Sequence, residues 1–111
     1  MLRTTPLRAK PRYKPVAVRR YHDWVASLGC LVCGSPAELH HVTSYADRPG
    51  RLSRDDMLVT PLCPLHHRGV GERAPFIVSV QSLGHRGFFQ EHGIDLLAEA
   101  MRLAEQRRAA A

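Results

Sequence analysis

The chain has 111 residues, 44% hydrophobic and 23% charged, which is the size and balance of a single soluble globular domain. No apolar stretch approaches the roughly 18 residues of a membrane span, and the N-terminus lacks the apolar core of a signal peptide. We therefore expect no membrane association and a cytoplasmic location. Lys and Arg outnumber Asp and Glu by 16 to 10, for a formal net charge of +6.

The positive charge is concentrated at the N-terminus. Residues 1–20 contain seven basic residues and no acidic one. Residues 1–14, with Pro6 and Pro11, predict a disordered basic arm, and 15–111 predict one domain. A basic arm favours a polyanionic partner, nucleic acid first, over a merely solubilising tail. The basic residues are Arg3, Arg8, Lys10, Arg12, Lys14, Arg19 and Arg20.

The predicted elements alternate between helices and short strands. A helix from Pro15 or Val16 ends at Gly29, and strands are expected over 37–43 and 58–62, separated by a polar loop. A helix begins near Cys63, residues 68–75 form a loop, 76–83 favour helix over strand, and a last helix covers 94–107. This order predicts an α+β fold.

Apolar spacing predicts which helical faces are buried. The first helix should bury Val18, Tyr21, Trp24, Val25 and Leu28. The last helix should bury Leu96, Leu97, Ala100, Met101 and Leu103.

The cysteines form a pattern typical of a structural zinc site. Cys30 and Cys33 are a C-x2-C pair, and Cys63 and His66 form a C-x2-H pair further along. Two such knuckles supply three sulfurs and one nitrogen to a tetrahedral ion. Three buried free thiols or a redox C-x2-C are the alternatives, but the redox hypothesis leaves Cys63 unexplained.

Three further histidines lie close to these ligands in sequence. Adjacent residues of a strand point to opposite sides, so His40 and His41 should have different roles. His67 follows the zinc ligand His66 and should leave the knuckle in another direction. For His22 and His92 the sequence offers no partner, and a surface or packing role is expected.

The two knuckles and the His-His pair together resemble the zinc-containing HNH, or ββα-metal, nucleases. The likeness is carried by YHDWVASLGCLVCG at 21–34, LHHV at 39–42, VTPLCPLHHR at 59–68 and, more loosely, FFQEHGIDLL at 88–97. It is strongest with the phage recombination-enhancement (Ref-like) nucleases, which also carry a basic, Pro-rich arm. The resemblance implies a small ββα-metal core with flanking helices.

The resemblance also implies a role for each histidine. His40 and His67 correspond to ligands of a catalytic divalent ion, Mg2+ or Mn2+, and His41 corresponds to the general base. The family's middle Asn is missing, since this chain has no Asn, and Asp56 is the nearest substitute, ahead of Asp55. Gly71 stands where many relatives have a third metal ligand, so Gln81 or His85 is the candidate for that position.

The function expected from these features is metal-dependent hydrolysis of DNA phosphodiester bonds by a phage- or prophage-encoded endonuclease or nickase linked to recombination. The expected partners are DNA and a recombinase filament, with the protein a monomer. Gly71 and the missing Asn keep a second hypothesis open, a zinc-stabilised nucleic-acid-binding module without cleavage. A zinc ribbon that binds only proteins is a third, disfavoured by the basic arm.

Overall fold

The computed structural model describes residues 15–42 and 56–110. Their fold is a two-stranded antiparallel hairpin surrounded by four helices, which confirms the α+β prediction. The five basic residues of 1–14 and Asp55 lie outside the described residues. None of the described helices has the length and apolar character needed to cross a membrane.

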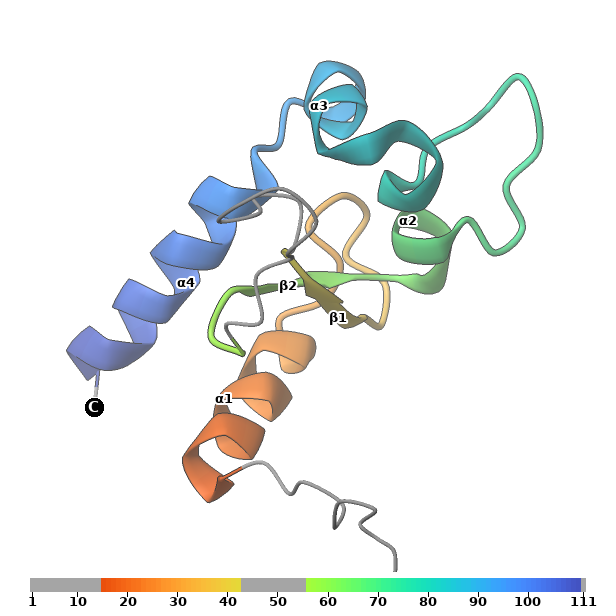
Figure 1. The fold of residues 1–111 in the computed structure, drawn as a ribbon. Coiled ribbons are helices and arrows are strands. Elements are labelled where there is room, and N and C mark those ends of the chain that lie inside the picture. Colours follow the sequence, from red (N-terminus) through yellow and green to blue (C-terminus); the bar gives the residue numbers. More distant parts are fainter. Residues whose placement is uncertain (1–14, 43–55, 111) are drawn as a thin grey trace, which may run out of the picture.

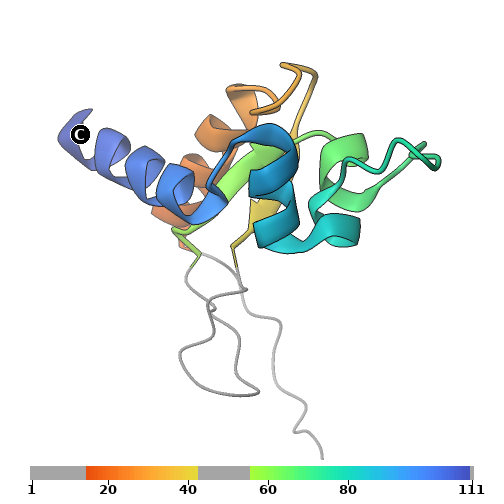
Figure 2. The ribbon, with the colours of Figure 1, turned by 90° about the horizontal axis from the view of Figure 1, so that it is seen from above.

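The elements follow one another as predicted up to the second knuckle. Helix α1 covers Val16–Ser27, strand β1 Glu38–His41, strand β2 Val59–Leu62 and helix α2 Pro64–Arg68. Helix α3 covers Val80–His92 and helix α4 Leu96–Ala110. In the hairpin, Glu38 pairs with Leu62, and His41 pairs with Val59. Figures 1 and 2 show α4 and α2 at opposite ends of this hairpin.

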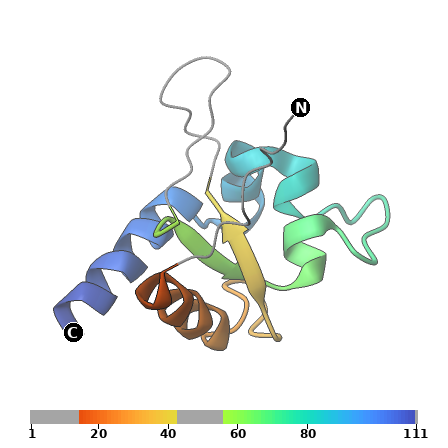
Figure 3. The same cartoon turned by 60° about the horizontal axis from the view of Figure 1, so that its bottom comes forward.

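Strand β2 is the centre of the packing, because all four of its residues are buried. Val59 belongs to one apolar cluster with Tyr21, Val25 and Leu103, between the hairpin, α1 and α4. Leu62 belongs to a second cluster with Phe88, Leu96 and the buried cysteines, beneath α3. In Figure 3, α1 and α4 accordingly lie on one side of the hairpin and α2 and α3 on the other.

The prediction of a helix over 76–83 was wrong in its first half. Residues 76–79 are not helical, and α3 begins only after Ser79, whose side chain accepts a hydrogen bond from Ser82 N. The Glu72 carboxylate accepts hydrogen bonds from the backbone N–H groups of Val78 and Ser79. These side-chain bonds to the backbone hold the apolar segment outside the helix, and periodicity alone cannot reveal them.

Two of the expected buried positions are exposed. Leu28 follows the end of α1 and is 46% exposed, and Met101 on α4 is 56% exposed. Helix α4 also begins later than expected, because the Asp95 carboxylate accepts a hydrogen bond from Ala98 N and so caps the helix there. The buried residues of α4 are Leu96, Ala100 and Leu103, and the expected Leu97 is half-buried against the core.

Candidate metal centres

The predicted zinc ligands come together from two turns of the chain. One turn, between α1 and β1, is closed by hydrogen bonds from Cys30 N to the Ser35 carbonyl and from Gly34 N to the Cys30 carbonyl. The other is the first turn of α2, which presents Cys63 and His66. One donor atom from each of the four residues lies within 4.8 Å of the others.

The donor distances match a tetrahedral ion. Bonds of about 2.3 Å to sulfur and about 2.0–2.1 Å to nitrogen set tetrahedral edges of about 3.6–3.8 Å. Cys33 Sγ is 3.7 Å from Cys63 Sγ, and His66 Nδ1 is 3.7 Å from Cys30 Sγ and 3.3 Å from Cys63 Sγ. All three cysteines are free. The cluster is thus a Cys3His set compatible with structural zinc.

The ionisation of these groups also suits a metal. Hydrogen bonding to Ser35 lowers the pKa of the exposed Cys33 thiol to about 7, whereas burial raises the pKa of Cys63. Burial, followed by the nearby His92, lowers the pKa of His66 and favours the neutral ring that a metal requires. A cation would stabilise the Cys63 thiolate, which burial alone disfavours.

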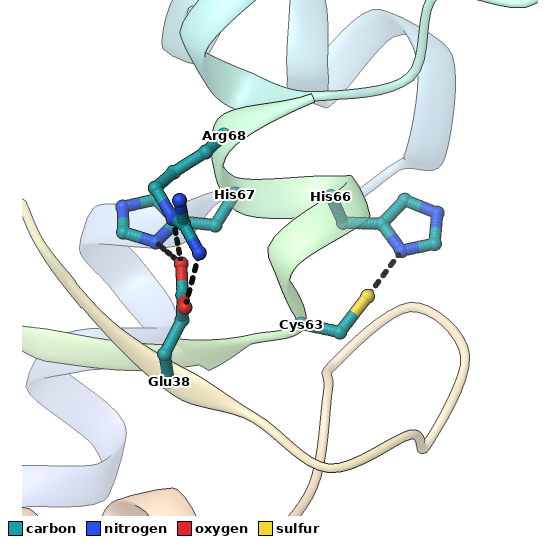
Figure 4. Close-up of polar contacts among 5 residues, drawn as sticks. All are labelled: Glu38, Cys63, His66, His67 and Arg68. Carbon is teal, nitrogen blue, oxygen red and sulfur yellow. Dashed lines mark hydrogen bonds and ion pairs between the residues drawn. The ribbon is translucent and has the colours of Figure 1, made fainter. Parts of the chain in front are cut away.

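The side chains of His66 and His67 point in different directions from helix α2, as predicted. Figure 4 shows His66 pointing to Cys63, while His67 points to Glu38 on β1. His67 Nδ1 is 2.6 Å from Glu38 Oε2, and the Arg68 guanidinium donates to both oxygens of the same carboxylate. Glu38 therefore fixes the His67 ring with Nδ1 as the donor and leaves Nε2 available as a ligand.

His40 lies beside His67 on the same side of the hairpin, two residues after Glu38. Its ring centroid is 5.1 Å from that of His67 and 5.1 Å from that of His85. His40 Nε2 and His85 Nε2 are 2.8 Å apart. Burial, together with the neighbouring His67 and His85, lowers the pKa of His40 to about 3, so the His40 ring is neutral at physiological pH. We call His40, His67 and His85 the histidine cluster.

The position of His85 depends on a kink in α3. Gly84 has φ 74° and ψ 171°, outside helical values, and the helix resumes with His85. A positive φ of this kind favours glycine. Of the two candidates for a third ligand, His85 lies against His40, whereas Gln81 is an exposed residue on the first turn of α3.

The buried hydroxyl of Thr60 lies on the same face of the hairpin as His40. Thr60 is directly opposite His40 in the hairpin, and cross-strand partners share one face of a sheet. Thr60 is 0% exposed, and its Oγ1 has no hydrogen-bond partner among the described residues. A buried hydroxyl without a partner is rare in folded proteins, and it marks this face as a place where a polar group can bind.

His41 lies on the opposite side of β1 from His40. His41 Nε2 is 3.5 Å from Asp56 Oδ1, and its ring centroid is 5.6 Å from that of His22. His22 is buried, and its Nε2 donates a 2.7 Å hydrogen bond to the Asp56 backbone carbonyl. One donor atom each from His22, His41 and Asp56 lies within 4.8 Å of the others.

The sequence prediction missed Glu38, Thr60 and the partner of His22. The alternation of strand residues was a signal for Glu38, because residues 38 and 40 of one strand share a face. The contact between His22 and Asp56 joins residues 34 positions apart, and no local pattern predicts it. His92 packs against Phe88 and donates to the Val78 carbonyl, in keeping with a packing role.

Comparison with known proteins yields a family but no described function. Neither the curated proteins nor the solved structures contain a significant match to this chain. Among protein families, residues 5–75 match one described as a protein of unknown function (DUF968). The matched segment includes all four residues of the Cys3His set and four of the other histidines, His22, His40, His41 and His67, but it ends before His85. The match covers more than half of the sequence, so the chain belongs to the DUF968 family.

Proposed function

We propose that this protein is an HNH-type, divalent-metal-dependent DNA endonuclease or nickase, of phage or prophage origin and associated with recombination in the bacterial cytoplasm. The observation that carries the proposal is that the two faces of β1 present different chemical groups. His40 lies in the histidine cluster on one face, and His41 lies beside a carboxylate on the other. Phosphodiester hydrolysis needs both a metal ligand set and a base.

The histidine cluster fits a divalent cation by its donor chemistry. His40 Nε2 and His85 Nε2 face one another at 2.8 Å, and the Glu38 carboxylate leaves His67 Nε2 free to bind. Mg2+ or Mn2+ bound by His40, His67 and His85 would act as a Lewis acid toward the phosphate and the leaving oxygen. The Thr60 hydroxyl, without a partner nearby, would hold a water at the same face.

His41 is the residue proposed to take the proton from the attacking water. A histidine that titrates near neutral pH is suited to this step. The Asp56 carboxylate, 3.5 Å away, orients the ring and stabilises the imidazolium that forms. His22 fixes the position of Asp56 through its backbone carbonyl, so it is a positioning residue.

The decisive experiment is a plasmid-nicking assay with purified protein and added Mg2+ or Mn2+. We expect conversion of supercoiled to open-circular DNA, and its loss in the His41→Ala variant with unchanged zinc content. Absence of nicking with every divalent ion tested, together with retained DNA binding, would overturn the nuclease and leave the zinc-stabilised nucleic-acid-binding module. The basic residues of 1–20 would serve either function as phosphate contacts.

A further inference from the structure

A pocket of about 530 Å³ opens between α1 and α4. This volume is in the range of small-ligand sites. Its apolar lining includes Ala17, Met57 and Ala104. Met57 directly follows Asp56, so the pocket borders the residues around His41.

The rim of the pocket is strongly basic. Arg20 from α1 and Arg107 and Arg108 from α4 line it, and no lining residue is acidic. The Arg107 guanidinium stacks on Trp24, 5.4 Å from the ring centroid, which orients it between the two helices. Arg108 has only an exposed ion pair with Glu105, a kind of contact that stabilises little. The rim therefore favours an anionic ligand.

Tyr21 provides an independent indication of a ligand. It lines the pocket and is 2% exposed, and its hydroxyl has no hydrogen-bond partner among the described residues. Burial raises the pKa of Tyr21, so the hydroxyl stays protonated and can donate. A ligand oxygen would supply the acceptor that the protein does not.

We propose that this pocket binds one unpaired nucleotide of a DNA strand, with the base on Met57 and Ala104 and the phosphate at the arginines. A nucleotide combines a flat apolar face with an anion, which is the combination that the pocket offers. The basic arm is a poor occupant because it carries the same charge as the rim. The inference rests on the proposed function in taking DNA as the ligand, and it adds a preference for single-stranded or frayed DNA.

The test is fluorescence anisotropy of the full chain with a labelled oligodeoxythymidine of about 12 nucleotides, within the range of known single-strand sites. A duplex of equal length is the comparison, and no divalent ion is added. Ala17→Leu and Ala104→Leu fill the pocket, and Ala98→Leu on the exposed face of α4 is the matched control. We expect the filling variants to weaken single-strand binding about tenfold and the control to change nothing.

Tyr21→Phe separates binding from folding. Because the hydroxyl has no partner among residues 15–42 and 56–110, its removal should leave the melting temperature unchanged or higher while single-strand affinity falls. Arg20→Gln should reduce the salt dependence of binding by about one unit of slope. Arg102→Gln is its control, since Arg102 bonds to Glu99 and Gln106 on the surface of α4.

Wild-type single-strand affinity in both filling variants would overturn the proposal, as would equal losses for single strand and duplex. Filling variants that instead abolish self-association, measured by sedimentation, would assign the pocket to a second copy and also overturn it. Neither result depends on cleavage. If the protein nicks plasmid and the filling variants bind single strands normally, the proposed function stands and only the pocket assignment fails. If the protein does not nick plasmid and the filling variants bind single strands weakly, the pocket assignment stands and the nuclease function fails.

Discussion

The two sides of α2 organise their histidines by different means. On the zinc side, donor atoms from two turns gather directly around one point, and no carboxylate is among them. On the other side, His67 is held by Glu38, and the neighbouring ring His85 comes from a kinked helix. The first arrangement is typical of a closed structural site and the second of a site with open positions. Under the proposed function, the zinc side maintains the fold and the histidine side holds the catalytic ion.

The largest effect is expected from Cys63→Ser on the zinc side. This change removes a ligand in the centre of the core, and binding of a structural zinc is coupled to folding, so both should be lost together. Zinc content by elemental analysis and the cooperativity of thermal unfolding measure the outcome. Ser35→Ala, which alters only the hydrogen bond to Cys33, should keep the metal. A cooperatively folded Cys63→Ser protein without zinc would contradict the claim that the zinc side maintains the fold.

The next largest effect is expected from His41→Ala. If His41 is the base, cleavage falls by roughly 10²–10⁴-fold while zinc content and melting temperature stay near those of wild type. His40→Ala should differ, because it would weaken binding of the proposed catalytic ion, so that more Mg2+ or Mn2+ should partly restore activity. A loss of stability without a selective loss of cleavage would show that His41 only packs.

Glu38→Gln should disturb only the histidine cluster and leave the zinc side unchanged, which sharpens the comparison. The neutral amide no longer fixes His67 as the carboxylate does, and loss of such a partner typically weakens metal binding or activity by about 10–100-fold. Titration of nicking with Mn2+ measures the shift in metal dependence. Glu99→Gln, which breaks an exposed ion pair with Arg102, is the matched control. An unchanged Mn2+ dependence would show that Glu38 does not support metal binding by the histidine cluster.

The smallest effect is expected from Gly84→Ala. Among the described residues nothing beyond the neighbours of Gly84 in the chain lies within 4 Å of an added Cβ, so the cost is that of a non-glycine residue at φ 74° and ψ 171°, about 1–3 kcal/mol. Thermal unfolding should show a modest decrease, and nicking should fall further because His85 moves. Gly87→Ala is the control, since its gain in helix propensity offsets a 3.1 Å contact with Leu83 Cβ. Equal effects of the two changes would mean that the kink at Gly84 is not needed to position His85.

The sequence predicted the zinc side almost completely because that side depends on local spacing. Cys30 and Cys33 share one turn, Cys63 and His66 share another, and each spacing of two is visible without the fold. The opposite directions of His40 and His41 also follow from the period of a strand.

The histidine side was predictable only in part, since its contacts join distant segments. The distance from His40 to His85 spans 45 positions, and that from His67 to Glu38 spans 29. The start of α3 was missed for a different reason, because it depends on side-chain hydrogen bonds to Glu72 that apolar periodicity does not show. Burial acts to raise the pKa of Glu72, but hydrogen bonds from Ser79, Ser82 and Val78 lower it to about 2 and hold the preceding segment outside the helix.

Helix α2 constrains how sequences of this kind can vary. It is five residues long and carries His66 and His67 in adjacent positions on different sides. Each residue of an α-helix turns the chain by about 100°, so one residue inserted after Cys63 would rotate both rings away from their partners at once. The residues between α2 and α3 carry neither set of ligands, and Figure 1 shows them reaching away from the hairpin. Among related sequences we therefore expect length differences to accumulate after Arg68 and to be absent from Cys63 to His67.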